Sequence, residues 1–136
     1  MKLPHEYKWD ECEHLIGNGW CLHVLRSPEQ TLFIDMPVDS GFISKSGCQA
    51  ISESDYCVLI RDRIRYHYLE SKLHEFWKPS LGKISETIEG QQQGKAVVKE
   101  SLYGPIDKES YAYFYYTKRA LQKKDTRPIN ERKVNV

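Results

Sequence analysis

The chain has 136 residues, of which 40% are hydrophobic and 29% are charged, and its formal net charge is +1. This balance is that of a folded globular domain with its own core, rather than that of a disordered or membrane protein. No stretch approaches the roughly 20 apolar residues that cross a bilayer, and the first residues lack the apolar part of a secretion signal. We therefore expect a cytoplasmic protein with reduced thiols and no membrane association.

The first third of the chain predicts a short helix followed by a β-hairpin. Apolar residues recur at helical spacing over 6–16, and a Gly-Asn-Gly stop follows. The segments 20–26 and 31–36 flank a Ser-Pro turn and have the character of two paired strands. Residues 37–54 are rich in Gly, Ser and Asp, which predicts a long loop with a short extended piece at 42–44.

The segment 56–68 decides the predicted fold, because its pattern fits a strand better than a helix. A strand places apolar side chains on one face, with Asp62 as the only charged intruder, and arginines on the other face. The period then changes to that of a helix over 69–77, which Pro79 ends.

The next segments predict a second hairpin. A short amphipathic helix over 81–88 leads into 90–94, whose sequence Gly-Gln-Gln-Gln-Gly has nothing to bury and predicts a loop. Residues 95–103 and 109–117 are rich in β-prone side chains and are joined by a Gly-Pro turn, which predicts two further strands.

A helix over 108–122, with Asp107 as its N-cap, is the alternative to the last strand. It would turn four apolar side chains inward: Tyr111, Phe114, Tyr115 and Leu121. In either case we expect one α+β domain over 1–117, with a mostly antiparallel sheet of about five strands and two or three helices packed on one face. Residues 118–136 lack periodicity and predict a basic, flexible tail.

Charge is distributed unevenly along the chain. Residues 1–39 carry three cations and seven acids, a net charge of −4, whereas residues 117–136 carry seven cations and two acids, a net charge of +5. A molecule with this dipole can orient toward an anionic partner although it is almost neutral overall. The alternative is that these charges only solvate the surface.

The arginines and tyrosines suggest a surface for nucleic acid. In an extended 56–68, three guanidinium groups stand about 7 Å apart on one face and can each pair with a phosphate, while tyrosines offer stacking platforms for bases. The candidate nucleic-acid-binding residues are Arg61, Arg63, Arg65, His67, Tyr111, Tyr113, Tyr115, Lys118, Arg119, Lys123 and Lys124. The alternative is structural: the arginines pair with acids such as Glu70, Glu100 and Glu109, and the rings pack in the core.

These patterns favour a small non-catalytic binding module whose partner is nucleic acid or a nucleic-acid-binding protein, and they leave a homodimer open. A second hypothesis is a stoichiometric protein-binding inhibitor, of the mobile-element, anti-defence or immunity type, that uses the acidic N-terminal third. The acids in question are Asp10, Glu11, Glu13, Asp35 and Asp39.

A third hypothesis is a small nuclease-like or transferase-like enzyme. It would use His67 beside Glu70 or Glu75, or the pair formed by His74 and Glu75. Motifs for phosphate loops and nucleophile elbows do not occur in the sequence, and we expect no cofactor.

We also expect no metal site, although Cys12-x-His14 and Cys21-x-His23 repeat a pair that zinc accepts. On the predicted first helix, Cys12 and His14 point away from each other and cannot share one ion. Cys21 and His23 would share a strand face, and His5 or Cys48 would have to complete the ligand set.

Overall fold

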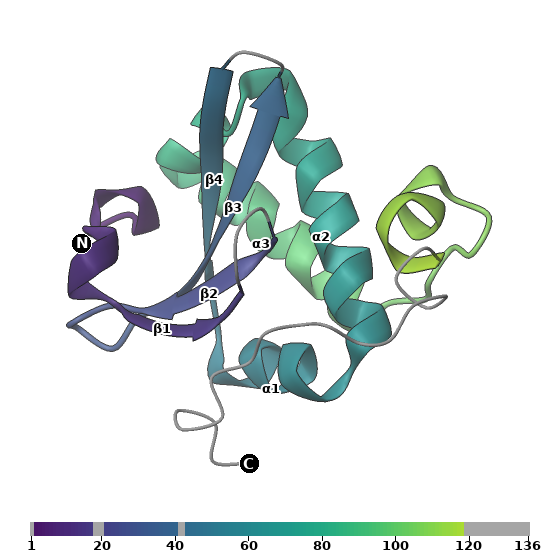
Figure 1. Cartoon of the computed structure of the whole chain (residues 1–136), viewed down its shortest axis with the longest axis horizontal. Coiled ribbons are helices and arrows are strands. Elements are labelled where there is room, and N and C mark those ends of the chain that lie inside the picture. The colour runs from purple at the N-terminus through teal and green to yellow at the C-terminus, as the bar shows by residue number, and fades with distance from the viewer. Residues whose placement is uncertain (1, 18–20, 41–42, 119–136) are drawn as a thin grey trace.

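The computed structural model of the chain describes residues 2–17, 21–40 and 43–118. It forms an α+β domain, as predicted, in which a four-stranded antiparallel sheet has the order β1-β2-β3-β4. The strands are β1 (Glu13–Ile16), β2 (His23–Arg26), β3 (Leu32–Ser40) and β4 (Ile43–Ile51), and the helices are α1 (Glu53–Arg61), α2 (Arg63–Trp77) and α3 (Ile88–Tyr103) (Figure 1). The sheet therefore has four strands rather than about five.

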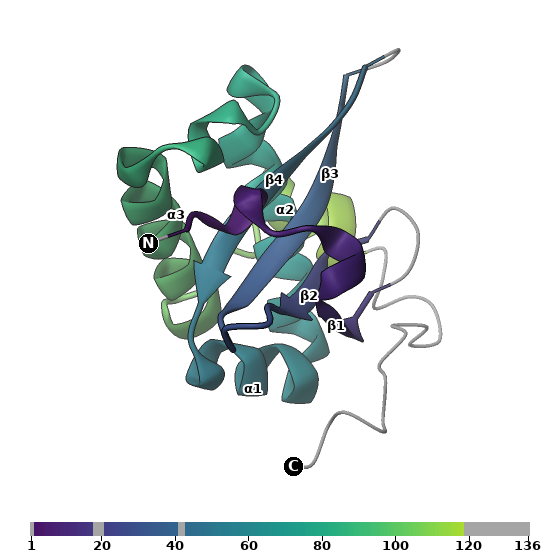
Figure 2. The same ribbon diagram turned by 90° about the vertical axis from the view of Figure 1, so that its left-hand side faces the viewer.

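The helices cover one face of the sheet, which we call the inner face (Figures 1 and 2). Alternate residues of β3 point to this face because side chains alternate along a strand. The inner-face core joins strand and helix residues that are almost fully buried: Val24, Ile34, Met36, Val38, Leu59, Tyr66, Leu69, Leu73 and Trp77. Within the described part of the chain, none of the helices has the length and apolar character needed to span a bilayer.

The opposite, outer face is partly covered by the N-terminal segment (residues 2–12), which crosses it as two 3₁₀ turns, Pro4–Glu6 and Trp9–Glu11 (Figure 2). The predicted helix over 6–16 is therefore wrong, since the second half of that range holds β1. Leu15 and Ile16 are both buried, because an irregularity in the β1–β2 pairing lies between His14 and Ile16. Two adjacent buried residues at the end of the range 6–16 gave its apolar residues a spacing that resembles that of a helix.

The hairpin predicted from 20–26 and 31–36 is confirmed as β2 and β3, which pair antiparallel. The loop predicted over 37–54 is wrong, because β3 continues to Ser40 and β4 follows it to Ile51 in register. At Gly47 the glycine serves packing rather than flexibility. Any Cβ there would overlap the Trp77 indole, so the strand needs a glycine to approach α2.

The strand predicted over 56–68 is also wrong, because this range is occupied by α1 and the beginning of α2. Ser52 caps α1 by accepting from the Asp55 N–H at 3.1 Å, while the Asp55 carboxylate accepts from the Ser52 N–H at 3.0 Å. Asp62, which the strand left unexplained, caps α2 by accepting from the Arg65 N–H at 3.1 Å. The helical period is interrupted at this cap, where α1 ends and α2 begins. The apolar residues over 56–68 therefore appeared to alternate as in a strand. The predicted end of the helix before Pro79 is confirmed, since α2 ends at Trp77.

The loop predicted over 90–94 and the strand predicted over 95–103 are wrong as well, because both ranges lie in α3. The predicted helix over 81–88 is a 3₁₀ turn, Lys83–Glu86, followed by the first residue of α3. Thr87 caps α3, and its hydroxyl accepts from the Gly90 N–H at 2.9 Å.

The side chains of Gln91 and Ser85 form hydrogen bonds with backbone groups of β4 on the side away from β3. The Gln91 side chain accepts from the Ala50 N–H at 3.0 Å and donates to the Cys48 carbonyl at 2.8 Å. The Ser85 hydroxyl accepts from the Cys48 N–H at 3.1 Å. Side chains thus make the hydrogen bonds that a fifth strand would make, which removes exposed donors and acceptors from this edge.

Two side chains of α2 hold the connection between β1 and β2. The Leu22 N–H donates to the buried Glu70 carboxylate at 3.0 Å, and the Tyr66 hydroxyl donates to the Leu22 carbonyl at 2.6 Å. Because both backbone groups are buried, these bonds satisfy groups that would otherwise destabilise the fold.

The strand predicted over 109–117 is wrong, and the alternative helix is closer to the structure. A helical segment runs over 111–118, with π-helical geometry at Tyr113–Lys118, and it packs against α2. The tail predicted over 118–136 lies outside the described residues from 119 onward.

Candidate functional site

The three arginines of the predicted ladder do not stand in one row. Arg61 is exposed at the end of α1, while Arg63 and Arg65 are partly buried in the first turn of α2. The Arg65 guanidinium donates to the carbonyls of Ser101 at 2.9 Å and Gly104 at 2.6 Å. Arg65 therefore closes the C-terminal end of α3, whose last carbonyls have no partner within the helix.

Replacing Arg65 by glutamine should lower the free energy of unfolding by about 1–2 kcal/mol, because two charge-assisted hydrogen bonds to α3 are lost. Arg61→Gln is the matched control, since Arg61 is exposed, and it should change stability by less than about 0.5 kcal/mol. Urea denaturation measures both variants. Equal stability of the two variants would contradict the structural role of Arg65.

His67 is held by its own helix. It is partly buried, and its Nδ1 lies 3.3 Å from the Glu70 carboxylate. The predicted proximity of His67 and Glu70 is confirmed. Glu70 also accepts a hydrogen bond from the Leu22 N–H, so its carboxylate stabilises the fold.

The exposed rings lie on the C-terminal helical segment. Tyr111 is 71% exposed, Phe114 54% and Tyr115 40%. We call these three residues the aromatic surface. The rings of Tyr111 and Tyr115 lie 5.5 Å apart, and the Lys118 ammonium lies 5.8 Å from the Phe114 ring. The inward orientation expected for these three rings in a helix over 108–122 is therefore wrong, and Leu121 lies outside the described residues.

Other residues of the same segment anchor it to α2. Ala112 and Thr117 are buried, while Tyr113 is partly buried. Tyr116 packs its ring edge-on against His74 at 6.3 Å. Burial, followed by the negative charge of Glu70, raises the pKa of Tyr116 to about 12, so its phenol stays neutral.

The start of this segment is fixed by two short polar side chains. The Ser110 hydroxyl accepts from the Tyr113 N–H at 3.1 Å, and the Asp107 carboxylate accepts from the Glu109 N–H at 3.0 Å. The cap predicted at Asp107 is thus shared with Ser110. Of the predicted cations, Lys118 is exposed, whereas Arg119, Lys123 and Lys124 lie outside the described residues.

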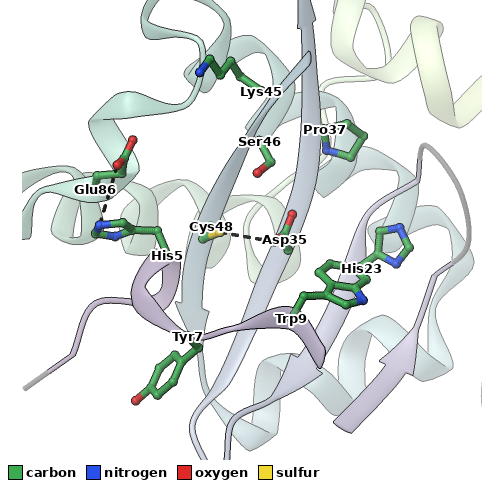
Figure 3. Close-up of a pocket in the computed structure, with 10 residues that line it drawn as sticks. All are labelled: His5, Tyr7, Trp9, His23, Asp35, Pro37, Lys45, Ser46, Cys48 and Glu86. Carbon is green, nitrogen blue, oxygen red and sulfur yellow. Dashed lines mark hydrogen bonds and ion pairs between the residues drawn. The ribbon is translucent and has the colours of Figure 1, made fainter. Parts of the chain in front are cut away.

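A second candidate site is a pocket of about 620 Å³ on the outer face of the sheet, which we call the outer-face pocket (Figure 3). The N-terminal segment, the three strands β2, β3 and β4, and the 3₁₀ turn before α3 all contribute to it. Its lining residues are His5, Tyr7, Trp9, His23, Asp35, Pro37, Lys45, Ser46, Cys48 and Glu86. The sheet register brings His23, Asp35 and Cys48 side by side, since His23 pairs with Asp35 and Asp35 with Cys48.

Asp35 lies at the middle of this pocket and is partly buried. Its carboxylate accepts from the Cys48 thiol at 3.6 Å (Figure 3). Burial raises the pKa of Asp35, while hydrogen bonding from Cys48, the charge of His23 and hydrogen bonding from Ser46 act in the opposite direction. Burial, followed by the charge of Asp35, raises the pKa of Cys48 far above its ordinary value, so this thiol is no nucleophile near neutral pH.

Trp9 and His23 line one side of the pocket, and His23 contacts His14, which lies outside the lining. His14 Nε2 and His23 Nδ1 share a hydrogen bond of 2.9 Å, so one ring donates and the other accepts. The Trp9 ring lies beside both imidazoles, tilted relative to His14 at a centroid distance of 5.6 Å and edge-on to His23 at 5.0 Å, and it is 46% exposed. Burial, followed by the charge of His23, lowers the pKa of His14.

The opposite wall carries a weaker pair. His5 Nε2 lies 3.7 Å from the Glu86 carboxylate, which is half exposed. Lys45 is exposed, and Figure 3 shows its side chain directed away from Asp35. The pocket thus holds two carboxylates, and its lysine faces outward.

Of the acids in the N-terminal third, Asp35 lines this pocket, whereas Asp10, Glu11 and Glu13 are not among its lining residues. Asp10, Glu11 and Glu13 are exposed. Burial raises the pKa of Cys12, and the charges of Glu11, Asp10, Glu29 and Asp35 raise it further. The side chain of Asp39 lies outside the described part of the structure.

Residues considered as zinc ligands lie on other elements than predicted. Cys12 and His14 lie on a turn and a strand, not on one helix, and His14 bonds His23 instead. Among the residues that the structure describes, no three His, Cys, Asp or Glu side chains are placed to hold a metal ion.

Sequence reasoning missed most of the pocket as a site. Asp35 was weighed only as one of several acids, and Trp9 and Glu86 were not considered for binding. A signal existed at Asp35, because a lone carboxylate inside the apolar run 32–36 must point away from the core that its neighbours fill. No comparable signal exists for Trp9, which reaches the pocket only because the N-terminal segment crosses the sheet. Comparison of the chain with protein-family models, curated proteins and solved structures found no match in any of the three, so its function has to be argued from the residues themselves.

Proposed function

We propose that the protein is a binding module without catalytic activity that engages single-stranded nucleic acid through the aromatic surface. The observation that carries this proposal is the exposure of Tyr111, Phe114 and Tyr115 on one helical segment. Exposed aromatic clusters of this kind are uncommon on soluble proteins and generally mark contact surfaces.

Stacking supplies the binding energy in this proposal. Bases of single-stranded RNA or DNA stack on aromatic side chains, and each stacked base contributes about 1–3 kcal/mol. Three rings on adjacent turns offer room for more than one base, since Tyr111 and Tyr115 lie 5.5 Å apart. Duplexes hide the faces of their bases, so we expect a preference for single strands.

Charge favours the same partner. Lys118 borders the rings, and the sequence that follows it, residues 119–136, contains six cations and two acids. A partner with phosphates beside flat rings matches this combination better than a neutral protein surface does. Binding should weaken as salt rises, because phosphate contacts release counterions. The arginines that first suggested this function contribute less, since Arg65 is committed to α3.

The test is a binding titration with fluorescently labelled single-stranded oligonucleotides at low and moderate salt. Changing Tyr111, Phe114 and Tyr115 together to alanine should weaken binding at least about 10-fold, because two or more stacking contacts are lost. The variant should remain folded, since all three rings are exposed.

Tyr103→Ala serves as the matched control, because Tyr103 is also an exposed aromatic residue but belongs to α3 and donates to Asp55. It should leave the affinity within about twofold of the unaltered protein. Failure of the unaltered protein to bind any oligonucleotide at low salt would contradict the proposal, and so would equal binding by the triple variant.

A further inference from the structure

Asp35 is a pocket carboxylate that forms no ion pair with a lysine or arginine of the described residues. The cation that acts on it is His23, which lines the same pocket and carries a charge only when its imidazole is protonated. Its polar partners are the thiol of Cys48 and the hydroxyl of Ser46, which are neutral groups. Placing a carboxylate where solvent is limited is unfavourable unless an opposite charge approaches it.

The walls around Asp35 suit a flat cation. Trp9 lines the pocket and is nearly half exposed. Tyr7 also belongs to the lining, but its ring stacks on Phe33 with centroids 5.8 Å apart, and Figure 3 shows it directed away from Asp35. Indole and phenol rings attract cations over their faces, and a planar guanidinium can stack on such a ring while it donates to a carboxylate. Glu86 on the opposite wall adds a second carboxylate, held 3.7 Å from His5.

Other classes of ligand fit this pocket less well. An anion would meet Asp35 and Glu86, while Lys45 points away from Asp35. A metal ion lacks a third suitably placed ligand among the described residues. Beside the pocket, burial raises the pKa of the Cys12 thiol, and the charges of Glu11 and Asp10 raise it further.

We infer that the outer-face pocket binds a guanidinium group, which pairs with the carboxylate of Asp35 and stacks on Trp9. The pocket volume of about 620 Å³ accommodates an arginine side chain with its neighbouring peptide groups. The same chemistry is offered by a small guanidinium compound and by an arginine of a partner polypeptide. This site is separate from the aromatic surface, because the two lie on opposite sides of the layer formed by the sheet and α2 (Figures 1 and 3).

The test uses the full chain, labelled with ¹⁵N, and follows its amide resonances at pH 8, where imidazole side chains are ordinarily neutral. The probes are N-acetyl-arginine amide, the citrulline analogue of the same shape without charge, and the lysine analogue. We expect saturable shifts around Asp35 and Trp9 with the arginine probe, at least fivefold weaker binding of the lysine probe, and no saturable binding of the citrulline probe.

Two further probes distinguish the source of the guanidinium. Methylguanidinium tests the head group alone, and the peptide Gly-Ser-Arg-Ser-Gly tests an arginine within a chain. Binding of methylguanidinium as tight as that of the peptide indicates a small-molecule ligand. Binding of the peptide at least tenfold tighter indicates a polypeptide partner.

Asp35→Asn should weaken binding of the arginine probe at least 10-fold, and Trp9→Ala at least threefold. The asparagine variant should fold, because it removes a charge that is unfavourable in this position. Glu89→Gln is the matched control, since Glu89 is an exposed acid on α3, and it should leave the affinity unchanged. Equal binding of the citrulline and arginine probes, or full affinity in folded Asp35→Asn, would overturn the inference. Either result would leave oligonucleotide binding at the aromatic surface unaffected.

Discussion

Gly90→Ala should destabilise the protein by about 1–3 kcal/mol, although alanine is the better helix former. Gly90 lies in the first turn of α3, and any Cβ there would overlap the carbonyl oxygen of Ile84. Relieving this overlap requires a backbone shift between α3 and the preceding 3₁₀ turn, and overpacking of this kind outweighs the gain of about 1 kcal/mol in helix propensity. Urea denaturation followed by circular dichroism measures the change.

Gln92→Ala is the control for Gly90→Ala, because Gln92 is exposed two residues later in the same helix. Its replacement should leave stability unchanged or raise it by a few tenths of a kcal/mol. If both alanine variants are equally stable, α3 does not approach the 3₁₀ turn as closely as the structure indicates.

Glu70→Ala should lower the free energy of unfolding by about 2–3 kcal/mol. The Leu22 N–H donates to the Glu70 carboxylate at 3.0 Å inside the protein, and hydrogen bonds to charged groups contribute about 1.5–3 kcal/mol. Removal of the carboxylate leaves that N–H buried without its acceptor, and His67 loses its neighbour at 3.3 Å. Thermal and chemical denaturation both report the loss.

Glu75→Ala tests whether this effect is specific. Glu75 lies on the same helix but is exposed, so its removal should change stability by less than about 0.5 kcal/mol. A loss at Glu70 no larger than the loss at Glu75 would show that Leu22 finds another acceptor. Hydrogen exchange at the Leu22 amide, slow in the unaltered protein and fast in Glu70→Ala, locates the change.

One turn and one helix end were predicted correctly from local sequence. Ser27-Pro28 marks the turn between β2 and β3, and Pro79 marks the end of α2. Both depend on local backbone chemistry, since proline fixes φ and removes a donor. Such signals do not depend on which segments later pack together.

Helices were missed where their capping residues were overlooked or their glycines misread. Ser52 with Asp55 is a capping box, and Asp62 is a second cap, yet the alternation between them suggested a strand. Gly90 and Gly94 read as a loop because glycine weakens a helix in isolation. In the structure both glycines allow close approach, at Gly94 to the Gln49 side chain, and this requirement is tertiary.

The candidate sites were predicted unevenly for the same reason. The density of aromatic residues over 111–116 marked this segment as a candidate contact surface but left open which rings face the solvent, and in the structure Tyr111, Phe114 and Tyr115 do. The predicted row of arginines required an extended backbone over 56–68, and this range is helical instead. The outer-face pocket depends on contacts between residues as distant as Trp9 and Glu86, which local patterns do not encode.

The side chains that border β4 restrict how this protein can assemble. Gln91 and Ser85 already occupy the hydrogen-bonding groups of Cys48 and Ala50, so an extended peptide or a second chain cannot add a strand along that part of β4 without displacing them. β1 is the other end of the sheet, and at four residues it offers only a short template. A homodimer built by joining sheets would therefore have to avoid this part of β4, and the occupied groups also guard the folded chain against β-type aggregation there.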